Sequence, residues 1–269
     1  MTVLDEAEEL SVRHFGDRHP ETAGIIYHKA EAHRVAGSYE TAERMARQAI
    51  LMQSQLLGEQ HPEVAASLLV LASIRLLHDD TQEAEAFSRR ALGILRARRS
   101  ESDLMVIAAM MLLARVCWLR GNPKETEELI RRVLKNKPPT LEAAGVDFFE
   151  AVQLLVVVLV DTRRFEEAAR VCLDLLSLLR TTCSEDDPAL VPCLEIFANV
   201  RLEMQELEDA KLLLERAIAI RRISGERDAG LGNALDTLAV VEEKAGHAEV
   251  AEEYRSAARA IARQLGIEC

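Results

Sequence analysis

The sequence predicts an all-α protein built from stacked pairs of helices. Its composition is helix-forming: Ala, Leu, Glu and Arg dominate, and the 269 residues include only 12 Gly and 7 Pro. The chain also repeats itself, since "GDRHPETA" at residues 16–23 returns 42 positions later as "GEQHPEVA" at residues 58–65. In addition, columns of small residues keep one register along the chain. A fixed period of this length is typical of a helical solenoid.

The repeat period is followed from one reference residue in each repeat, which we call its station. The first station is His19, and each later station lies 42 positions further on, except that the last step is 41 positions. Eleven, 23 and 30 positions after each station stand mostly small side chains, which allow helices to approach closely. We therefore expect these columns at the helix crossings. The stations are His19, His61, Asp103, Gly145, Asp187 and Asp228. The column 11 positions after them contains Ala30, Ala72, Ala114, Val156, Ala198 and Ala239, and the column 23 positions after them contains Ala42, Ala84, Thr126, Ala168, Ala210 and Ala251. The column 30 positions after them contains Ala49, Ala91, Val133, Leu175, Ala217 and Ala258.

Each repeat unit has the pattern of two amphipathic helices. From Glu63 to Leu77 the apolar residues recur at three- and four-residue spacings, "HDDT" interrupts them, and "EAEAFSRRALGIL" resumes a helical pattern. Proline after a station residue suits the first helical turn. The prediction is a single array over residues 1–269 of about 13 helices, irregular near "KNKPPTLEAAG". It comprises a lone capping helix at 1–18 and repeats 19–60, 61–102, 103–144, 145–186, 187–227 and 228–269.

The stretch "GEQHPEVAASLLVLASIRLLHDDTQEAEAFSRRALGI" resembles the tetratricopeptide repeat in the 42-residue form found in kinesin light chain. "AGSYETAERMARQAI" and "LEDAKLLLERAIAI" support the resemblance. It implies a right-handed superhelix in which the first helix of each repeat lines a concave groove. Such a groove would bind a peptide or helical segment of another protein.

The groove-facing residues are expected 8, 12 and 15 positions after each station, on one helix face. This stripe is apolar in the middle and acidic in the last two repeats. Arg115 would bind a ligand carboxylate or pair with a nearby acid, and Glu195 and Asp236 would favour basic ligand residues. The alternative is that the stripe, Trp118 included, is core. The candidate partner-binding residues are Leu69, Ser73, Leu76, Met111, Arg115, Trp118, Gln153, Val157, Val160, Glu195, Asn199 and Asp236.

The first helix of the fourth repeat, "DFFEAVQLLVVVLVD" at residues 147–161, is apolar nearly all round. A helix of this kind is normally buried on every side. A bound peptide, a second copy of the chain or the curvature of the fold could cover it. The sequence therefore leaves open a homodimer formed through the fourth repeat.

Charge and motifs bear on the remaining function classes. A net charge of −12 argues against nucleic acid and anionic membranes as partners. The five cysteines are odd in number and form no C-x-x-C, and the N-terminus has no signal-peptide pattern, which favours a cytoplasmic protein with reduced thiols. No catalytic, phosphate-binding or metal motif occurs, so we expect neither enzyme activity nor a cofactor.

The expected function is that of a non-catalytic scaffold or adaptor that binds another protein. One alternative is a regulatory array that controls an attached or associated effector, because the chain begins in mid-repeat and could belong to a larger protein. A self-assembling structural repeat protein is the other.

Overall fold

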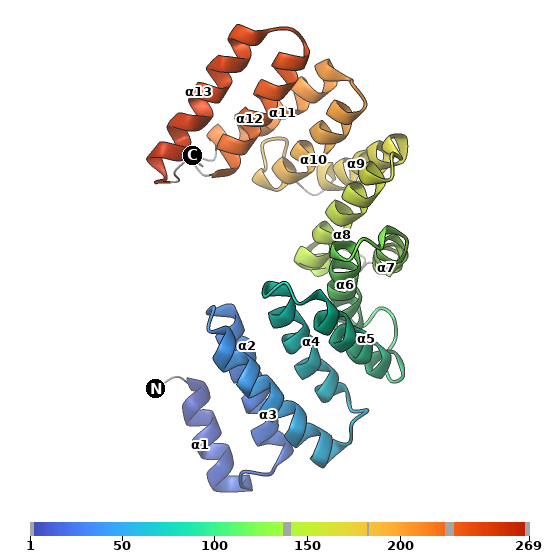
Figure 1. The fold of residues 1–269 in the computed structure, drawn as a ribbon, viewed down its shortest axis with the longest axis vertical. Coiled ribbons are helices and arrows are strands. Elements are labelled where there is room, and N and C mark those ends of the chain that lie inside the picture. The colour runs from blue at the N-terminus through green and yellow to red at the C-terminus, as the bar shows by residue number, and fades with distance from the viewer. Residues whose placement is uncertain (1–2, 137–140, 182, 224–228, 267–269) are drawn as a thin grey trace. The chain divides into compact units, whose positions relative to one another are not determined.

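The computed structural model describes residues 3–136, 141–181, 183–223 and 229–266. Their regular structure is entirely helical, which confirms the all-α prediction (Figure 1). The chain divides into two compact units, residues 1–151 and residues 152–269, and the boundary falls inside the helix α8 (Leu141–Asp161). The helices are α1 (Val3–Phe15), α2 (Pro20–Val35), α3 (Tyr39–Leu57), α4 (Pro62–Leu77), α5 (Thr81–Arg96), α6 (Leu104–Leu119), α7 (Pro123–Lys135), α8 (Leu141–Asp161), α9 (Phe165–Arg180), the short 3-10 helix η1 (Pro188–Leu190), α10 (Val191–Glu203), α11 (Leu207–Ile223), α12 (Ala229–Lys244) and α13 (Ala248–Gln264).

Four of the six station residues are helix caps, whereas Gly145 stands inside a helix and Asp228 lies outside the described residues. In four repeats the station side chain accepts a hydrogen bond from the backbone N–H two residues later, which satisfies one of the unpaired donors at a helix N-terminus. The following proline, where present, occupies the first helical turn. The two histidines of the repeated motif are therefore explained by capping. The acceptors and their distances to that N–H are His19 Nδ1 (3.2 Å), His61 Nδ1 (3.3 Å), Asp103 Oδ1 (2.9 Å) and Asp187 Oδ1 (2.9 Å).

The turn between the two helices of each repeat uses a left-handed backbone at one fixed position, 18 residues after the station. This conformation ends many helices, and glycine adopts it without the clash that a Cβ causes. Half of the repeats have glycine there and half do not. The residues and their φ angles are Gly37 (77°), Asp79 (58°), Gly121 (72°), Arg163 (60°), Gln205 (64°) and Gly246 (89°).

The three columns of small residues lie in the core, as the period predicts. Every member is at most 5% exposed, including the larger Val133 and Leu175. In the third repeat the Thr126 hydroxyl donates to the Ala114 carbonyl oxygen at 3.4 Å, which directly joins two columns. Short side chains at these crossings permit the close approach of the helices.

In unit 1, residues 1–151, three hairpins follow α1: α2 with α3, α4 with α5, and α6 with α7. Successive first helices also touch one another, since α2 contacts α4 and α4 contacts α6. The exposed sides of α2, α4 and α6 form what we call the first-helix face of unit 1. The exposed sides of α3, α5 and α7 form its second-helix face.

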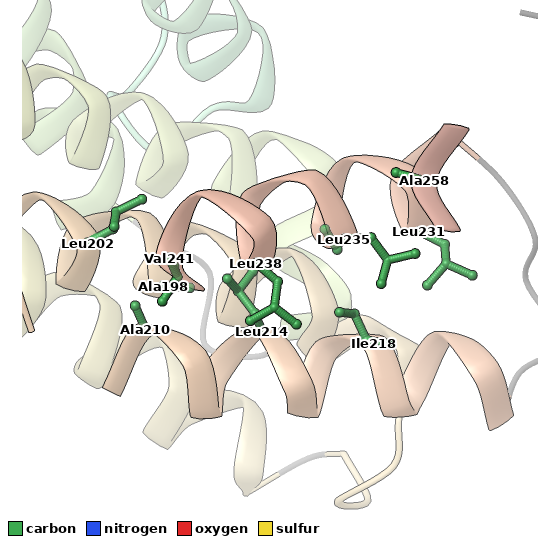
Figure 2. Close-up of a cluster of buried hydrophobic side chains, with 11 residues drawn as sticks. Ala198, Leu202, Ala210, Leu214, Ile218, Leu231, Leu235, Leu238, Val241 and Ala258 are labelled. Carbon is green, nitrogen blue, oxygen red and sulfur yellow. The ribbon is translucent and has the colours of Figure 1, made fainter. Parts of the chain in front are cut away.

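Unit 2, residues 152–269, has an aliphatic core between α10, α11, α12 and α13 (Figure 2). Leu214 and Leu235 are among its fully buried side chains, and Ala198, Ala210 and Ala258 come from the small-residue columns. Figure 2 shows the leucines of α12 and α11 directed toward one another. The low aromatic content of the sequence is consistent with this aliphatic packing.

The helix α8 departs from the repeat pattern. It is 21 residues long and begins at Leu141, so station Gly145 stands inside it rather than at its start. The prolines of the irregular junction, at positions 138 and 139, lie outside the described residues. Most of the apolar residues of α8 are buried in the core. Among the described side chains of this helix, Val157 is the large apolar residue that is clearly exposed, at 43%. The buried members are Val152, Leu155, Val156, Val158 and Leu159.

Candidate protein-binding surface

The predicted stripe on α4 and α6 divides into a buried floor and a surface. Leu69 and Met111 are buried, at 9% and 4% exposed, because neighbouring first helices touch and cover this position. Ser73 is half-buried, and its hydroxyl donates to the Leu69 carbonyl oxygen at 2.9 Å, within its own helix. Leu76 and Trp118 are half-buried and contribute to the surface.

Arg115 is the cation of this stripe. Its Nη1 lies 3.8 Å from Oε1 of Glu150, and the two side chains are 50% and 43% exposed. A pair this exposed contributes about 0–1 kcal/mol. Of the two predicted roles, the structure contains the pairing with a nearby acid, and the weakness of that pair leaves Arg115 available to an incoming carboxylate.

The first-helix face carries an apolar row that the sequence stripe missed. Val35, Leu77 and Leu119 are the last residues of α2, α4 and α6, and they are 74%, 54% and 59% exposed. All three stand 16 positions after a station, next to the half-buried Leu76 and Trp118. Exposed apolar residues in a series mark interaction sites more often than isolated ones do. We call these three residues the apolar row.

The opposite end of α2 and α4 is acidic. Glu21 and Glu63 stand in the first turns of the two helices, are exposed and make no ion pair within the described part of the chain. Tyr27 is half-buried beside them, and burial, followed by the charge of Glu31, raises the pKa of its phenol. Carboxylates beside an aromatic ring favour a cation. This acidic pocket has a volume of about 290 Å³ and is lined by Pro20, Glu21, Gly24, Tyr27, His28, Gln53, Glu63 and Ala66.

The predicted stripe of unit 2 is more polar. Val157 is exposed, whereas Gln153 and Val160 are half-buried. Glu195 accepts a hydrogen bond from Arg221 Nε at 3.1 Å, so this carboxylate already has a cationic partner. Asn199 and Asp236 are exposed.

In unit 2 the positions equivalent to the apolar row carry charged residues. Asp161, Glu203 and Lys244 stand 16 positions after their stations and are exposed. An exposed apolar series at this position is therefore a property of unit 1.

Cysteine, metal and membrane chemistry find little support in the described part of the chain. Burial raises the pKa of the Cys117, Cys172 and Cys193 thiols to about 12, which keeps them protonated and unreactive at neutral pH. Cys269 lies outside the described residues. Within those residues, no group of three or more His, Cys, Asp or Glu side chains is placed to hold a metal ion, and no helix is long and apolar enough to cross a membrane.

Comparison with known families decides what the repeats are. Residues 21–97, which span the hairpins of α2 with α3 and α4 with α5, match the model of the family described as "Tetratricopeptide repeat". Residues 21–97 therefore contain tetratricopeptide repeats. A search of curated proteins finds no match.

Solved tetratricopeptide-repeat structures share this fold. A putative kinesin light chain repeat protein of Podosopora anserina is 20% identical, over 77% of this chain and 98% of that one, with a TM-score of 0.69. BtubC (BKLC) from P. vanneervenii is 19% identical, over 100% and 94%, with a TM-score of 0.65. The apo form of RapI is 17% identical, over 97% and 72%, with a TM-score of 0.77. The similarity establishes the fold and confirms the predicted resemblance.

Tetratricopeptide repeats generally serve as protein-interaction scaffolds and are generally non-catalytic. In this chain the residues that best suit such a role are partly those of the predicted stripe and partly the apolar row. The row follows the same 42-residue spacing as the motif, so a search for exposed apolar residues at helix C-termini would have found it in the sequence.

Proposed function

We propose that the protein is a cytoplasmic, non-catalytic scaffold or adaptor, and that the first-helix face of unit 1 binds a short segment of another protein. The observation that carries this proposal is the apolar row. Val35, Leu77 and Leu119 occupy equivalent positions on helices that touch in series, and each is more than half exposed. Burying them against a ligand would contribute about 25 cal/mol for each Å² of apolar surface removed from water.

The acidic pocket adds a second requirement for the ligand, namely a positively charged side chain. Leu77 is 14 residues after Glu63 on α4, which corresponds to about 21 Å along the helix. An extended peptide covers that distance in about six or seven residues. The preferred segment therefore carries apolar side chains at one end and a Lys or Arg about six or seven residues away.

A structural neighbour is consistent with peptide binding by this fold. YrrB is described as "a TPR protein with an unusual peptide-binding site", and it is 15% identical to this chain, over 80% of this chain and 93% of YrrB, with a TM-score of 0.52. That site belongs to YrrB. It supports the proposal only as an example of peptide binding by this fold.

The proposal is tested with a displayed library of random peptides, selected on the wild-type protein and then measured individually. The Leu77→Glu/Leu119→Glu double variant should lose at least tenfold in affinity for the selected peptides. The matched control is Leu51→Glu on α3, because Leu51 is also 59% exposed but lies on a second helix. Equal binding by the double variant and the wild type would overturn the proposal.

A further inference from the structure

A second pocket lies on the second-helix face of unit 1, between α5 and α7 and above α6. It has a volume of about 260 Å³. Leu92, Leu113 and Leu129 form its buried apolar floor, and Arg96 and Arg132 are among the side chains that surround it. The pocket shares no lining residue with the first-helix face, so it is independent of the proposed function.

The cations beside this pocket have too few acceptors. Arg132 binds the carboxylate of Glu101 through Nη2 and, at 3.4 Å, through Nε. Nε of Arg96 lies 3.6 Å from Oε1 of the same carboxylate, which is beyond hydrogen-bond reach. Two guanidinium groups therefore share one carboxylate, and Arg132 takes it.

Arg96 is left unsatisfied. Its Nε and Nη2 are buried and have no hydrogen-bond partner in the described part of the chain. Burial, followed by the charge of Arg132, lowers the pKa of Arg96, although a guanidinium remains charged at neutral pH. Buried donors without an acceptor are energetically unfavourable, and an added anion would relieve this.

The third arginine of the pocket does not share this deficit. Arg89 Nη1 and Nη2 lie 2.6 and 2.8 Å from the two oxygens of Glu125, in a bidentate pair. Glu128 also borders the pocket and is exposed. The nearby acids limit the positive potential, which favours a singly charged anion over a dianion.

Gly93 lines the pocket and adds no side chain to it. It lies in the interior of α5, and a Cβ at this position would meet no atom within 4 Å. Alanine would stabilise an exposed helix interior by about 0.5–1 kcal/mol relative to glycine. Packing therefore does not require a glycine here, whereas access to the pocket benefits from one.

We infer that this pocket binds a carboxylate attached to a short aliphatic group. The planar guanidinium of Arg96 matches a carboxylate in a bidentate manner, and the three leucines match the aliphatic part. The volume of about 260 Å³ is just below the range of about 300–1,000 Å³ for small-molecule sites, which limits the bound group to about one side chain with its carboxylate. The C-terminal residue of a peptide and a free aliphatic acid both have this chemistry.

The test is a calorimetric and NMR titration of the full chain with four probes. These are the peptide acetyl-Ala-Ala-Leu with a free C-terminus, the same peptide as its amide, sodium octanoate and inorganic phosphate. The free peptide should bind and shift the methyl signals of Leu92 and Leu129, and the amide should bind at least tenfold more weakly. Octanoate that binds more tightly than the peptide identifies a free acid as the ligand; the reverse identifies a peptide C-terminus. Tighter binding of phosphate than of either carboxylate would overturn the assignment.

Two variants locate the site. Arg96→Gln should weaken binding at least tenfold, and Gly93→Leu should abolish it by filling the mouth. Arg98→Gln is the control, because Arg98 is exposed on the following turn and does not line the pocket. Thermal unfolding should show Gly93→Leu to be at least as stable as the wild type. Unchanged binding in both pocket variants, or no saturable binding by any carboxylate probe, would refute the inference.

Discussion

Nζ of Lys211 on α11 lies 2.7 Å from Oε1 of Glu242 on α12, and the Glu242 side chain is only 2% exposed. His247 Nδ1, at the start of α13, lies 2.7 Å from the other oxygen of the same carboxylate. One buried carboxylate thus connects the fifth repeat with both helices of the sixth. In a solenoid each repeat is held in place by contacts with its neighbours, so this connection contributes to the stability of the sixth repeat.

The Lys211–Glu242 pair predicts a specific pH dependence. The hydrogen bond from Lys211 is the largest cause that lowers the pKa of Glu242 from its ordinary 4.5. The resulting stabilisation is present above the unfolded-state pKa and is lost as the pH falls through the lower folded-state pKa. Glu242→Gln should reduce the free energy of unfolding at pH 7 by about 1–3 kcal/mol and flatten its decline between pH 6 and 3. Urea unfolding across that range measures both, and parallel pH profiles for variant and wild type would contradict the prediction.

The left-handed turn position predicts a stabilising substitution. Gln205 has a φ of 64°, whereas three other repeats have glycine at the corresponding position: Gly37, Gly121 and Gly246. Gln205→Gly should raise the free energy of unfolding by about 1 kcal/mol, because it removes the Cβ clash of this conformation. Gln205→Ala is the control and should give no gain. Chemical denaturation distinguishes them, and a destabilised glycine variant would show that the Gln205 side chain is needed.

The small-residue columns predict where the core does not accept added volume. Ala72 is completely buried, whereas Ala86 is exposed on α5. Ala72→Leu should lower the free energy of unfolding by about 1–3 kcal/mol through overpacking. Ala86→Leu should change it by no more than about 0.5 kcal/mol. The melting temperatures of the two variants compare these effects, and equal shifts would argue against close helix contact at Ala72.

Substitutions of the candidate groove residues should fall into two classes, those that reduce peptide affinity and those that destabilise the fold. Trp118→Ala and Arg115→Glu should reduce the affinity for selected peptides while the protein remains folded, because both side chains reach the surface. Leu69→Ala should instead destabilise the fold by about 2–5 kcal/mol, since Leu69 is buried. Paired measurements of peptide affinity and melting temperature test this, and full peptide affinity in both Trp118→Ala and Arg115→Glu would remove them from the binding surface.

Much of the fold could be predicted because it depends on local and periodic features. The caps at His19 and His61, the buried alanine columns and the alternation of helices all follow from residue type and spacing. The long α8 did not follow, since its station is Gly145, which offers no side chain to cap a helix start.

The candidate surface was predicted less completely, because its outline depends on how neighbouring helices meet. Contact between first helices buries Leu69 and Met111. Leu76 and Leu77 are adjacent in the sequence and point in different directions around the helix, so Leu76 is half-buried whereas Leu77 is exposed. The second pocket, on the second-helix face of unit 1, depends on Arg96 and Arg132 competing for Glu101, a residue 31 positions before Arg132. Such long-range pairing leaves no periodic signal.

The three buried columns also limit how much of the sequence the scaffold requires. Most repeats place a small side chain at each of three crossings, and structures at 15–20% identity share the architecture. Substitutions on the exposed sides of the helices leave these crossings unchanged. The exposed faces of such a protein could therefore be redesigned by a few substitutions while its framework stays the same.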